Sequence, residues 1–153
     1  MPRIVFIIIV LILVGLVVWG AIALFKGGGF GMGGNKAGTS FTVEGMTVEV
    51  LREGKGKEAQ NSDMVTVNYV GTLTNGTKFD SSYDRKRALT FVVGEGKVIK
   101  GWDLGLVGMR VDEKRRLTIP AELAYGATGF PAAGIPENAT LVFEVELLRI
   151  VGK

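Results

Sequence analysis

The chain has 153 residues and contains neither histidine nor cysteine, which excludes Ser-His-Asp and Cys-His nucleophilic sites and metal sites built from these ligands. The formal net charge of +3 comes from three basic residues before position 41, and residues 41–153 carry 15 basic and 15 acidic side chains. A neutral domain lacks the basic surface that binds nucleic acid. We therefore expect no nucleic acid, no metal and no other cofactor among its ligands.

The most apolar part of the chain is residues 4–25, a run of 22 residues without a charged side chain. As a helix this run would extend roughly 33 Å, enough for a bilayer core of about 30 Å. We predict a single-pass membrane anchor over residues 1–26, with the rest of the chain on the extracytoplasmic side. A cleaved signal peptide is the alternative, since Arg3 and Ala21-Ile22-Ala23 resemble its positive segment and cleavage site, but the run exceeds the usual length of about 7–15 residues.

Residues 27–40 contain seven glycines and few side chains that can pack. Such a segment behaves as a flexible linker with a root-mean-square span of roughly 20 Å. The remaining residues, 41–153, are enough for one domain with a single hydrophobic core.

Much of this domain follows the two-residue period of β-strands. Apolar and polar side chains alternate over residues 65–73, and Asn75-Gly76, a pair preferred in type I′ hairpin turns, follows. In the final predicted strand, apolar side chains fall on one face and Glu144 and Glu146 on the other, which predicts a sheet with one covered and one solvated face. This final strand is residues 140–150, and the other predicted strands are residues 91–93 and 115–119.

One segment, residues 98–109, follows a helical period instead, with Trp102 and Leu106 on one face. Gly101 and Gly105 weaken such a helix, so packing against the sheet must hold it in place. The predicted fold class is α+β, an antiparallel sheet wrapped around one short helix and preceded by a transmembrane helix.

Aromatic residues next to glycines indicate a pocket in this domain. Trp102 follows Gly101, and Tyr125 opens a glycine-bounded loop. Each aromatic residue taken alone fits an ordinary core position, so the case for a pocket rests on their number. Asp80 follows Phe79 after the hairpin, and a buried carboxylate there needs a polar partner, for which a tyrosine hydroxyl is the obvious candidate.

Two basic clusters, residues 85–87 and 114–116, are predicted to be solvated faces of a turn and a strand. The acidic pairs Asp112-Glu113 and Asp80 with Asp84 are also predicted to lie in solvated turns. Neither pair is accompanied by a second feature of a glycosidase cleft.

Four segments of the domain are distinctive in their order and spacing: Phe79-Asp80-Ser81-Ser82, Val98-Ile99-Lys100-Gly101-Trp102, Ala124-Tyr125-Gly126-Ala127-Thr128-Gly129 and Ala139-Thr140-Leu141-Val142-Phe143. In these segments residues 48–150 resemble the FKBP-type peptidyl-prolyl isomerase family. The resemblance implies a half-open antiparallel sheet around a short helix, with a proline-binding pocket between them. It further implies isomerisation of X-Pro bonds in unfolded or nascent chains, here near a membrane, and we expect the chain to act as a monomer.

The resemblance also implies which residues form the site. Trp102 would form the pocket floor, and the Ile99 amide and the Tyr125 hydroxyl would bind substrate carbonyls. Asp80 would lie at the pocket edge, tied to Tyr69. The implied catalytic residues are Tyr69, Asp80, Ile99, Trp102, Tyr125 and Phe143, and the implied substrate-binding residues are Phe79, Leu89, Phe91, Val98, Phe130 and Ile135.

Three features depart from the family pattern. Leu89 stands where many members carry an aromatic wall residue, and Phe130 stands where a histidine is common. The loop at residues 131–135 is one residue longer than in compact members. We expect these differences to affect the residue preferred before proline and the affinity for tacrolimus and rapamycin, the macrolide inhibitors that the resemblance implies.

The composition suits this reaction. Rotation about an X-Pro bond has a barrier of about 18–20 kcal/mol and needs no covalent bond and no proton transfer. An apolar pocket disfavours the planar, more dipolar ground state relative to the twisted transition state. The alternative is a non-catalytic or chaperone module whose pocket only holds proline-containing segments.

Overall fold

The computed structural model describes residues 36–151. The predicted anchor, residues 1–26, lies outside the described residues, and so does most of the predicted linker. Within the described range, no helix combines the length and the apolar composition that a membrane span requires.

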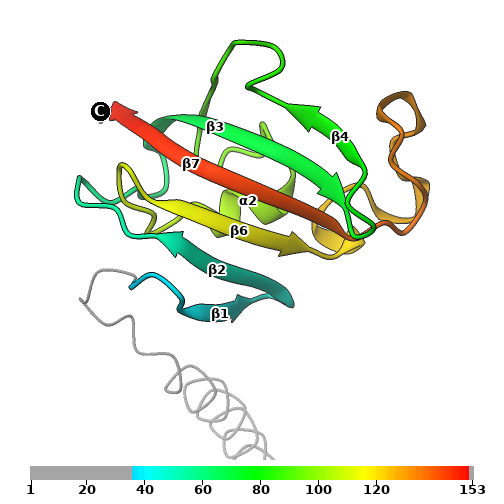
Figure 1. The fold of residues 1–153 in the computed structure, drawn as a ribbon, viewed down its shortest axis with the longest axis horizontal. Coiled ribbons are helices and arrows are strands. Elements are labelled where there is room, and N and C mark those ends of the chain that lie inside the picture. Colours follow the sequence, from blue (N-terminus) through cyan, green and yellow to red (C-terminus); the bar gives the residue numbers. More distant parts are fainter. Residues whose placement is uncertain (1–35, 152–153) are drawn as a thin grey trace, which may run out of the picture. The chain divides into compact units, whose positions relative to one another are not determined.

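Residues 36–151 form one antiparallel sheet of seven strands together with short helical segments (Figure 1). The strands are β1 (Ser40–Val43), β2 (Met46–Arg52), β3 (Met64–Leu73), β4 (Lys78–Ser81), β5 (Leu89–Val92), β6 (Lys114–Ile119) and β7 (Leu141–Val151). Their order across the sheet is β1-β2-β6-β7-β3-β4, and β5 also pairs with β3. The predicted α+β class, an antiparallel sheet with a short helix, is confirmed.

The longest pairing joins β3 and β7, from Met64 opposite Val151 to Leu73 opposite Leu141. Burial alternates along both strands as predicted. The residues of these strands that are at most 5% exposed are Val65, Val67, Tyr69, Leu141, Phe143, Val145 and Leu147. One face of the sheet therefore covers the core.

The turn between β3 and β4 differs from the predicted type I′ turn. The Gly76 amide donates to the Leu73 carbonyl and the Leu73 amide donates to the Thr77 carbonyl, both at 2.9 Å. In this turn only Gly76 has a positive φ, +87°, whereas a type I′ turn also requires one at Asn75. The prediction is wrong because the Asn75 side chain accepts the Thr77 amide at 2.9 Å, which stabilises a three-residue loop with glycine in its left-handed position.

Strands β4 and β5 pair with the same edge of β3, one after the other. β4 lies opposite residues 70–72, and β5 lies opposite residues 64–67. Residues 82–88 leave the sheet between these two strands. This loop brings Arg85 back toward the end of β4, where Asp80 lies.

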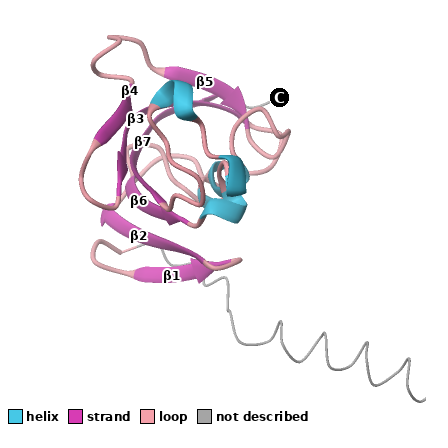
Figure 2. Ribbon diagram, turned by 90° about the vertical axis from the view of Figure 1, so that its right-hand side faces the viewer, coloured by secondary structure: helices cyan, strands magenta, loops and turns pink. Residues whose placement is uncertain are grey.

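Helix α2 (Lys100–Gly105) lies on the side of the curved sheet that Figure 2 shows as concave. It is shorter than the predicted segment 98–109. Ile99 is extended, with φ −60° and ψ 148°, so the helix begins only after it. At its other end the helix stops at Gly105, and Gly108, with a φ of +76°, is not helical.

Two glycines of α2 explain how this helix packs on the sheet. A Cβ at Gly101 would lie 2.5 Å from the side chain of Ile119, and one at Gly105 would lie 2.9 Å from that of Leu117. Because these positions lack side chains, the helix approaches β6 closely. The packing that the weak helix was expected to need is therefore supplied by β6.

Two charged residues that were predicted to be solvated are buried. Glu113 is 0% and Arg115 is 1% exposed, and Nε of Arg115 lies 2.5 Å from Oε1 of Glu113. Nη1 of Arg115 also donates to the carbonyls of Gly105 and Val107, at 2.8 and 3.1 Å. The prediction is wrong because Arg115 lies on the core face of β6, next to carbonyls at the end of α2 that lack helical partners.

Residues 120–140 connect β6 to β7 through the 3₁₀ segments η2 (Ala121–Leu123), η3 (Gly126–Thr128) and η4 (Pro131–Ala133). Gly129 has a φ of +64°, and a Cβ there would lie 2.4 Å from the Pro136 carbonyl oxygen. The Asn138 amide donates to the Gly126 carbonyl at 3.0 Å. These contacts fold the connection back on itself.

Candidate active site

A cavity of about 350 Å³ opens between α2, the core face of the sheet and the connection 120–140. Since a water molecule occupies about 30 Å³ of liquid volume, the cavity is large enough for a five-membered ring and its neighbouring peptide groups. It is lined by Tyr69, Phe79, Asp80, Leu89, Lys97, Val98, Ile99, Trp102, Tyr125, Phe130, Ala133, Ile135 and Phe143. Most of these side chains are apolar.

Trp102, on α2, is held by three other rings. Its ring centroid lies 4.9 Å from that of Tyr69, 5.3 Å from that of Phe143 and 5.8 Å from that of Phe91. The interplanar angles to Tyr69 and Phe143 are 87° and 89°, the edge-to-face geometry that aromatic pairs favour. Only 3% of Trp102 is exposed, and its Nε1 is buried without a hydrogen-bond partner in the part of the chain that the structure describes. The indole is therefore fixed in one orientation at the cavity.

Phe79 and Phe143 form one wall of the cavity. Their ring centroids are 5.5 Å apart at an angle of 85°. A Cβ at Gly71 would lie 2.7 Å from Cζ of Phe79 and 2.8 Å from Cε1 of Phe143. Both rings therefore occupy space on β3 that is open only because residue 71 is a glycine.

Asp80 belongs to a network of hydrogen bonds at the cavity. The Tyr69 hydroxyl donates to Oδ2 of Asp80 at 2.5 Å, and the Ser81 amide donates to Oδ1 at 2.8 Å. Arg85 donates to both partners, from Nη1 to Oδ1 of Asp80 and from Nη2 to the Tyr69 hydroxyl oxygen at 2.5 Å. Its guanidinium carbon lies 5.5 Å from the centroid of the Tyr69 ring.

This network keeps Tyr69 protonated and oriented. Burial raises the pKa of the Tyr69 hydroxyl, and the hydrogen bond to Asp80 raises it further, while Arg85 acts in the opposite direction. Residues 85–87 are exposed, as predicted for this basic cluster, but the loop returns the Arg85 guanidinium to the Asp80 carboxylate, a contact that was not predicted.

Two hydrogen-bond donors at the cavity lack partners. Among residues 36–151, no acceptor bonds the Ile99 amide and no group bonds the Tyr125 hydroxyl. Burial raises the pKa of Tyr125, and the charge of Asp80 raises it further. The hydroxyl therefore remains a donor at neutral pH, and both groups are available to the carbonyl oxygens of a bound peptide.

The outer rim of the cavity is aromatic. Tyr125 and Phe130 stack with centroids 5.4 Å apart and ring planes at 22°, and they are 38% and 45% exposed. Phe130 is positioned by backbone hydrogen bonds with Ile135, at 2.9 and 3.1 Å. Ile135 itself is 2% exposed.

All of the predicted site residues except Phe91 line the cavity. Phe91 was predicted to bind substrate, but it is 7% exposed and packs in the core against Trp102. Lys97 and Ala133 also line the cavity but were not predicted, although Lys97 directly precedes the Val98-Ile99 segment. The contact of Arg85 with Asp80 was not predicted either, because Arg85 lies within a basic cluster. Among residues 36–151, no group of three acidic side chains is placed to hold a metal ion.

Comparison with known proteins identifies this arrangement. The family model described as FKBP-type peptidyl-prolyl cis-trans isomerase matches residues 55–148. The chain belongs to this family. The matched region, here called the FKBP domain, is therefore a peptidyl-prolyl cis-trans isomerase. Proline-containing polypeptides are the general class of its substrates.

Curated relatives match the FKBP domain over nearly their whole length. The FK506-binding protein of Neisseria meningitidis serogroup B is 57% identical over 107 residues, which cover 69% of this chain and 96% of the relative. FK506-binding protein 1A of Neurospora crassa is 52% identical over 111 residues, covering 72% of this chain and 92% of the relative.

A solved structure shares the fold of the FKBP domain. The crystal structure of FkpA from Escherichia coli matches with a TM-score of 0.68 and 45% identity. The match covers 76% of this chain and 53% of FkpA, so the chain spans about half the length of that protein.

Proposed function

We propose that the FKBP domain accelerates rotation about X-Pro bonds by binding the proline ring against Trp102. The observation that supports this proposal is the cavity itself, which places a fixed indole between apolar walls. The bond to be rotated has a barrier of about 18–20 kcal/mol because resonance gives it partial double-bond character.

The proposed catalytic effect is a change of environment around the amide. The planar ground state is more dipolar than the twisted transition state, so removing water destabilises it relative to the twisted form. A barrier lowered by about 7 kcal/mol corresponds to roughly five decades in rate. No proton moves and no covalent bond forms.

Polar groups are proposed to hold the twisted backbone. The Ile99 amide and the Tyr125 hydroxyl would donate to substrate carbonyl oxygens on either side of the proline. Asp80 would act at the cavity edge, where Tyr69 and Arg85 fix its carboxylate. The remaining lining residues would determine which side chains fit beside the proline.

The FKBP domain is further proposed to be tethered to a membrane. Residues 1–26 would form the anchor, residues 27–40 the linker, and residues 41–153 the isomerase domain on the extracytoplasmic side. Its clients would then be unfolded or nascent chains close to the membrane. Because one copy of the chain supplies the whole cavity, the domain is proposed to act as a monomer. A reporter fused after Lys153 would test the topology through its activity on one side of the membrane or the other.

The same cavity is the proposed binding site for tacrolimus, also called FK506, and for rapamycin. The printed names of the curated relatives support this ligand class. Leu89 lies in the cavity lining, where an aromatic side chain is common in the family. It offers no ring face to a macrolide, so we expect an affinity different from that of those members.

A non-catalytic proline-binding or chaperone module is the rival proposal. The test is the rate of cis-to-trans exchange in a short proline peptide, measured by NMR with the purified full-length chain. If the domain is catalytic, exchange is well above the uncatalysed rate, and tacrolimus abolishes this acceleration. A folded chain that binds the peptide but leaves its exchange at the uncatalysed rate would leave only the binding module.

A further inference from the structure

Lys97 is the one basic residue among those that line the cavity. Its ammonium group takes part in no ion pair or hydrogen bond among residues 36–151. The next lysine, Lys100, differs in this respect, because its Nζ lies 2.8 Å from a carboxylate oxygen of Glu44. The charge of Lys97 is therefore available to a molecule that occupies the cavity.

The acidic residue of the lining does not offset this charge. Asp80 accepts hydrogen bonds from Tyr69, Ser81 and Arg85, and its ion pair with Arg85 compensates its charge within the protein. Since the formal charges of Asp80 and Arg85 cancel, the lining residues together with Arg85 carry a net formal charge of +1, that of Lys97.

The backbone that leads to Lys97 is fixed by α2. Asp103 accepts the Gly94 amide at 2.8 Å through Oδ1 and the Gly96 amide at 2.9 Å through Oδ2. Both glycines have positive φ, +82° and +66°, so this loop has a conformation that other residues rarely adopt. The start of the lysine side chain is thus held at the cavity.

We propose that Lys97 is a specificity-determining residue, which favours substrates that carry an acidic side chain directly before or after the proline. The inference rests on the proposed binding of proline against Trp102. A carboxylate about 7 Å from the ammonium group, at an effective dielectric constant of about 60, gains a factor of roughly three to four in binding. Added salt weakens this gain because the charges are exposed to solvent.

The test compares peptides that differ only in one side chain. Capped peptides carry glutamate, glutamine or lysine either before or after the proline, and kcat/KM for exchange is measured by NMR with the full-length chain at low ionic strength. The glutamate-to-glutamine ratio is used because it cancels any effect that a substitution has on both peptides. For the wild type we expect a glutamate-to-glutamine ratio of about three, either before or after the proline or at both positions. For Lys97→Gln we expect a ratio near one. Lys97→Glu is expected to prefer the lysine peptide.

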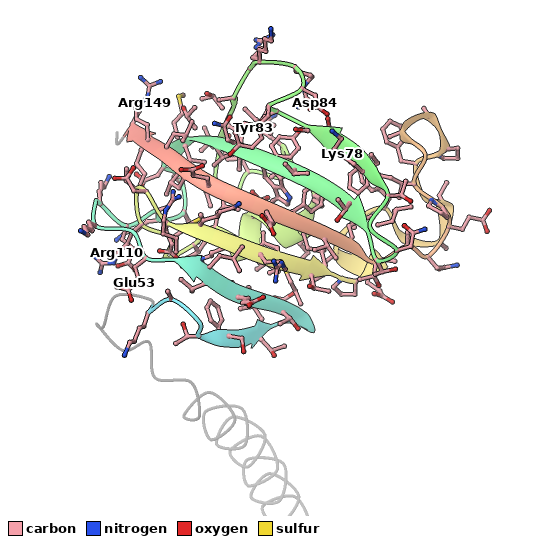
Figure 3. All side chains as sticks on the ribbon, viewed as in Figure 1. Glu53, Lys78, Tyr83, Asp84, Arg110 and Arg149 are labelled. Atoms are coloured by element: carbon pink, nitrogen blue, oxygen red, sulfur yellow. The ribbon has the colours of Figure 1, made fainter. Side chains whose placement is uncertain are left out.

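A matched control separates a local effect from a change in net charge. Lys55 is an exposed lysine outside the cavity lining, and its amide donates to the Val111 carbonyl at 3.1 Å. Its neighbours Glu53 and Arg110 lie at the opposite end of the molecule from the connection 120–140 (Figure 3). Lys55→Glu is expected to retain the wild-type ratio.

The two possible failures are distinguishable. If the wild type does not accelerate exchange of the glutamine peptide, the proposed function fails. If it does accelerate this exchange, two results would overturn the role of Lys97. One is a glutamate-to-glutamine ratio that is the same in wild type, Lys97→Gln and Lys97→Glu at both positions. The other is a change of this ratio in Lys55→Glu as large as that in Lys97→Glu.

Discussion

The hydroxyl of Tyr69 lies 2.5 Å from Oδ2 of Asp80, and the ring that carries this hydroxyl packs edge-to-face against Trp102. A polar contact at the cavity edge is thereby connected to the aromatic group at its centre. Since a hydrogen bond to a charged group is stronger than one between neutral groups, this contact fixes the Tyr69 ring more firmly than packing alone.

Removal of this hydroxyl is expected to reduce activity while leaving the ring in place. Tyr69→Phe loses a hydrogen bond to a charged group, worth about 1.5–3 kcal/mol, and we expect kcat/KM for proline-peptide exchange to fall at least about tenfold. Tyr83→Phe is the control, because the Tyr83 hydroxyl bonds Glu146 at 3.2 Å outside the cavity lining (Figure 3). Equal effects of the two substitutions would contradict a specific role for Tyr69.

Trp102 and Phe91 are in ring contact, but only Trp102 lines the cavity. We expect Trp102→Phe to reduce kcat/KM by more than tenfold, because the smaller ring no longer fills the position against which proline is proposed to bind. Phe91→Leu is expected to lower the free energy of unfolding by about 1–2 kcal/mol and to change kcat/KM less than twofold. Exchange rates and urea unfolding measure both effects, and a larger loss of activity in Phe91→Leu would contradict this assignment.

The buried pair of Glu113 and Arg115 is expected to matter for stability. Burial lowers the pKa of Arg115, and Glu113 counteracts this effect. Arg115→Met removes the ion-pair partner of the buried Glu113 carboxylate, so we expect the free energy of unfolding to fall by about 3–5 kcal/mol. The double substitution Glu113→Gln with Arg115→Met should cost less, because no charge is left buried. Urea unfolding of both variants tests this, and a double variant less stable than Arg115→Met would refute the explanation.

The pH dependence of activity follows from the two tyrosines at the cavity. The pKa values of Tyr69 and Tyr125 are raised by burial, so both hydroxyls stay protonated up to at least the ordinary tyrosine pKa of about 10. We expect kcat/KM to be constant from pH 7 to 9 and to fall only above about pH 10. A raised pKa in the folded state also means that stability is lost as the pH rises through it. Far-UV circular dichroism should therefore accompany the exchange measurements, and a decline between pH 7 and 9 would be incompatible with this expectation.

Acid stability is expected to depend on Glu144. Hydrogen bonds from Lys114 and Arg116 lower the pKa of this carboxyl group. A lowered pKa in the folded state stabilises the fold above the unfolded value of about 4.3. This contribution is lost as the pH falls through the folded value.

Glu144→Gln measures this contribution directly. The side chain is 35% exposed, so we expect the substitution to cost less than about 1 kcal/mol at pH 7 and almost nothing at pH 3. Urea unfolding at the two pH values provides the comparison. A difference between wild type and variant that grows toward pH 3 would show that the sign is wrong.

The sequence by itself determined four of the seven strands, β3, β5, β6 and β7, and the chemical character of the cavity, whereas β1, β2 and β4 were not predicted. Alternation along residues 65–73 and 140–150 identified the core faces of β3 and β7 correctly, because a strand exposes its side chains on two sides by geometry alone. The spacing of Phe79, Trp102 and Tyr125 was enough to recognise the family. These are local properties of the chain, and the sequence specifies them without knowledge of distant neighbours.

The tertiary structure alone decided which residues on a given face reach the cavity. Leu89 and Phe91 lie two positions apart on β5, so their side chains share a face, but Leu89 lines the cavity and Phe91 packs in the core against Trp102. Arg85 and Arg115 both occur in basic clusters, yet one returns to Asp80 and the other is buried under α2. A two-residue period fixes the side of the sheet, whereas the partner of each side chain depends on segments that are distant in sequence and are brought together only by folding.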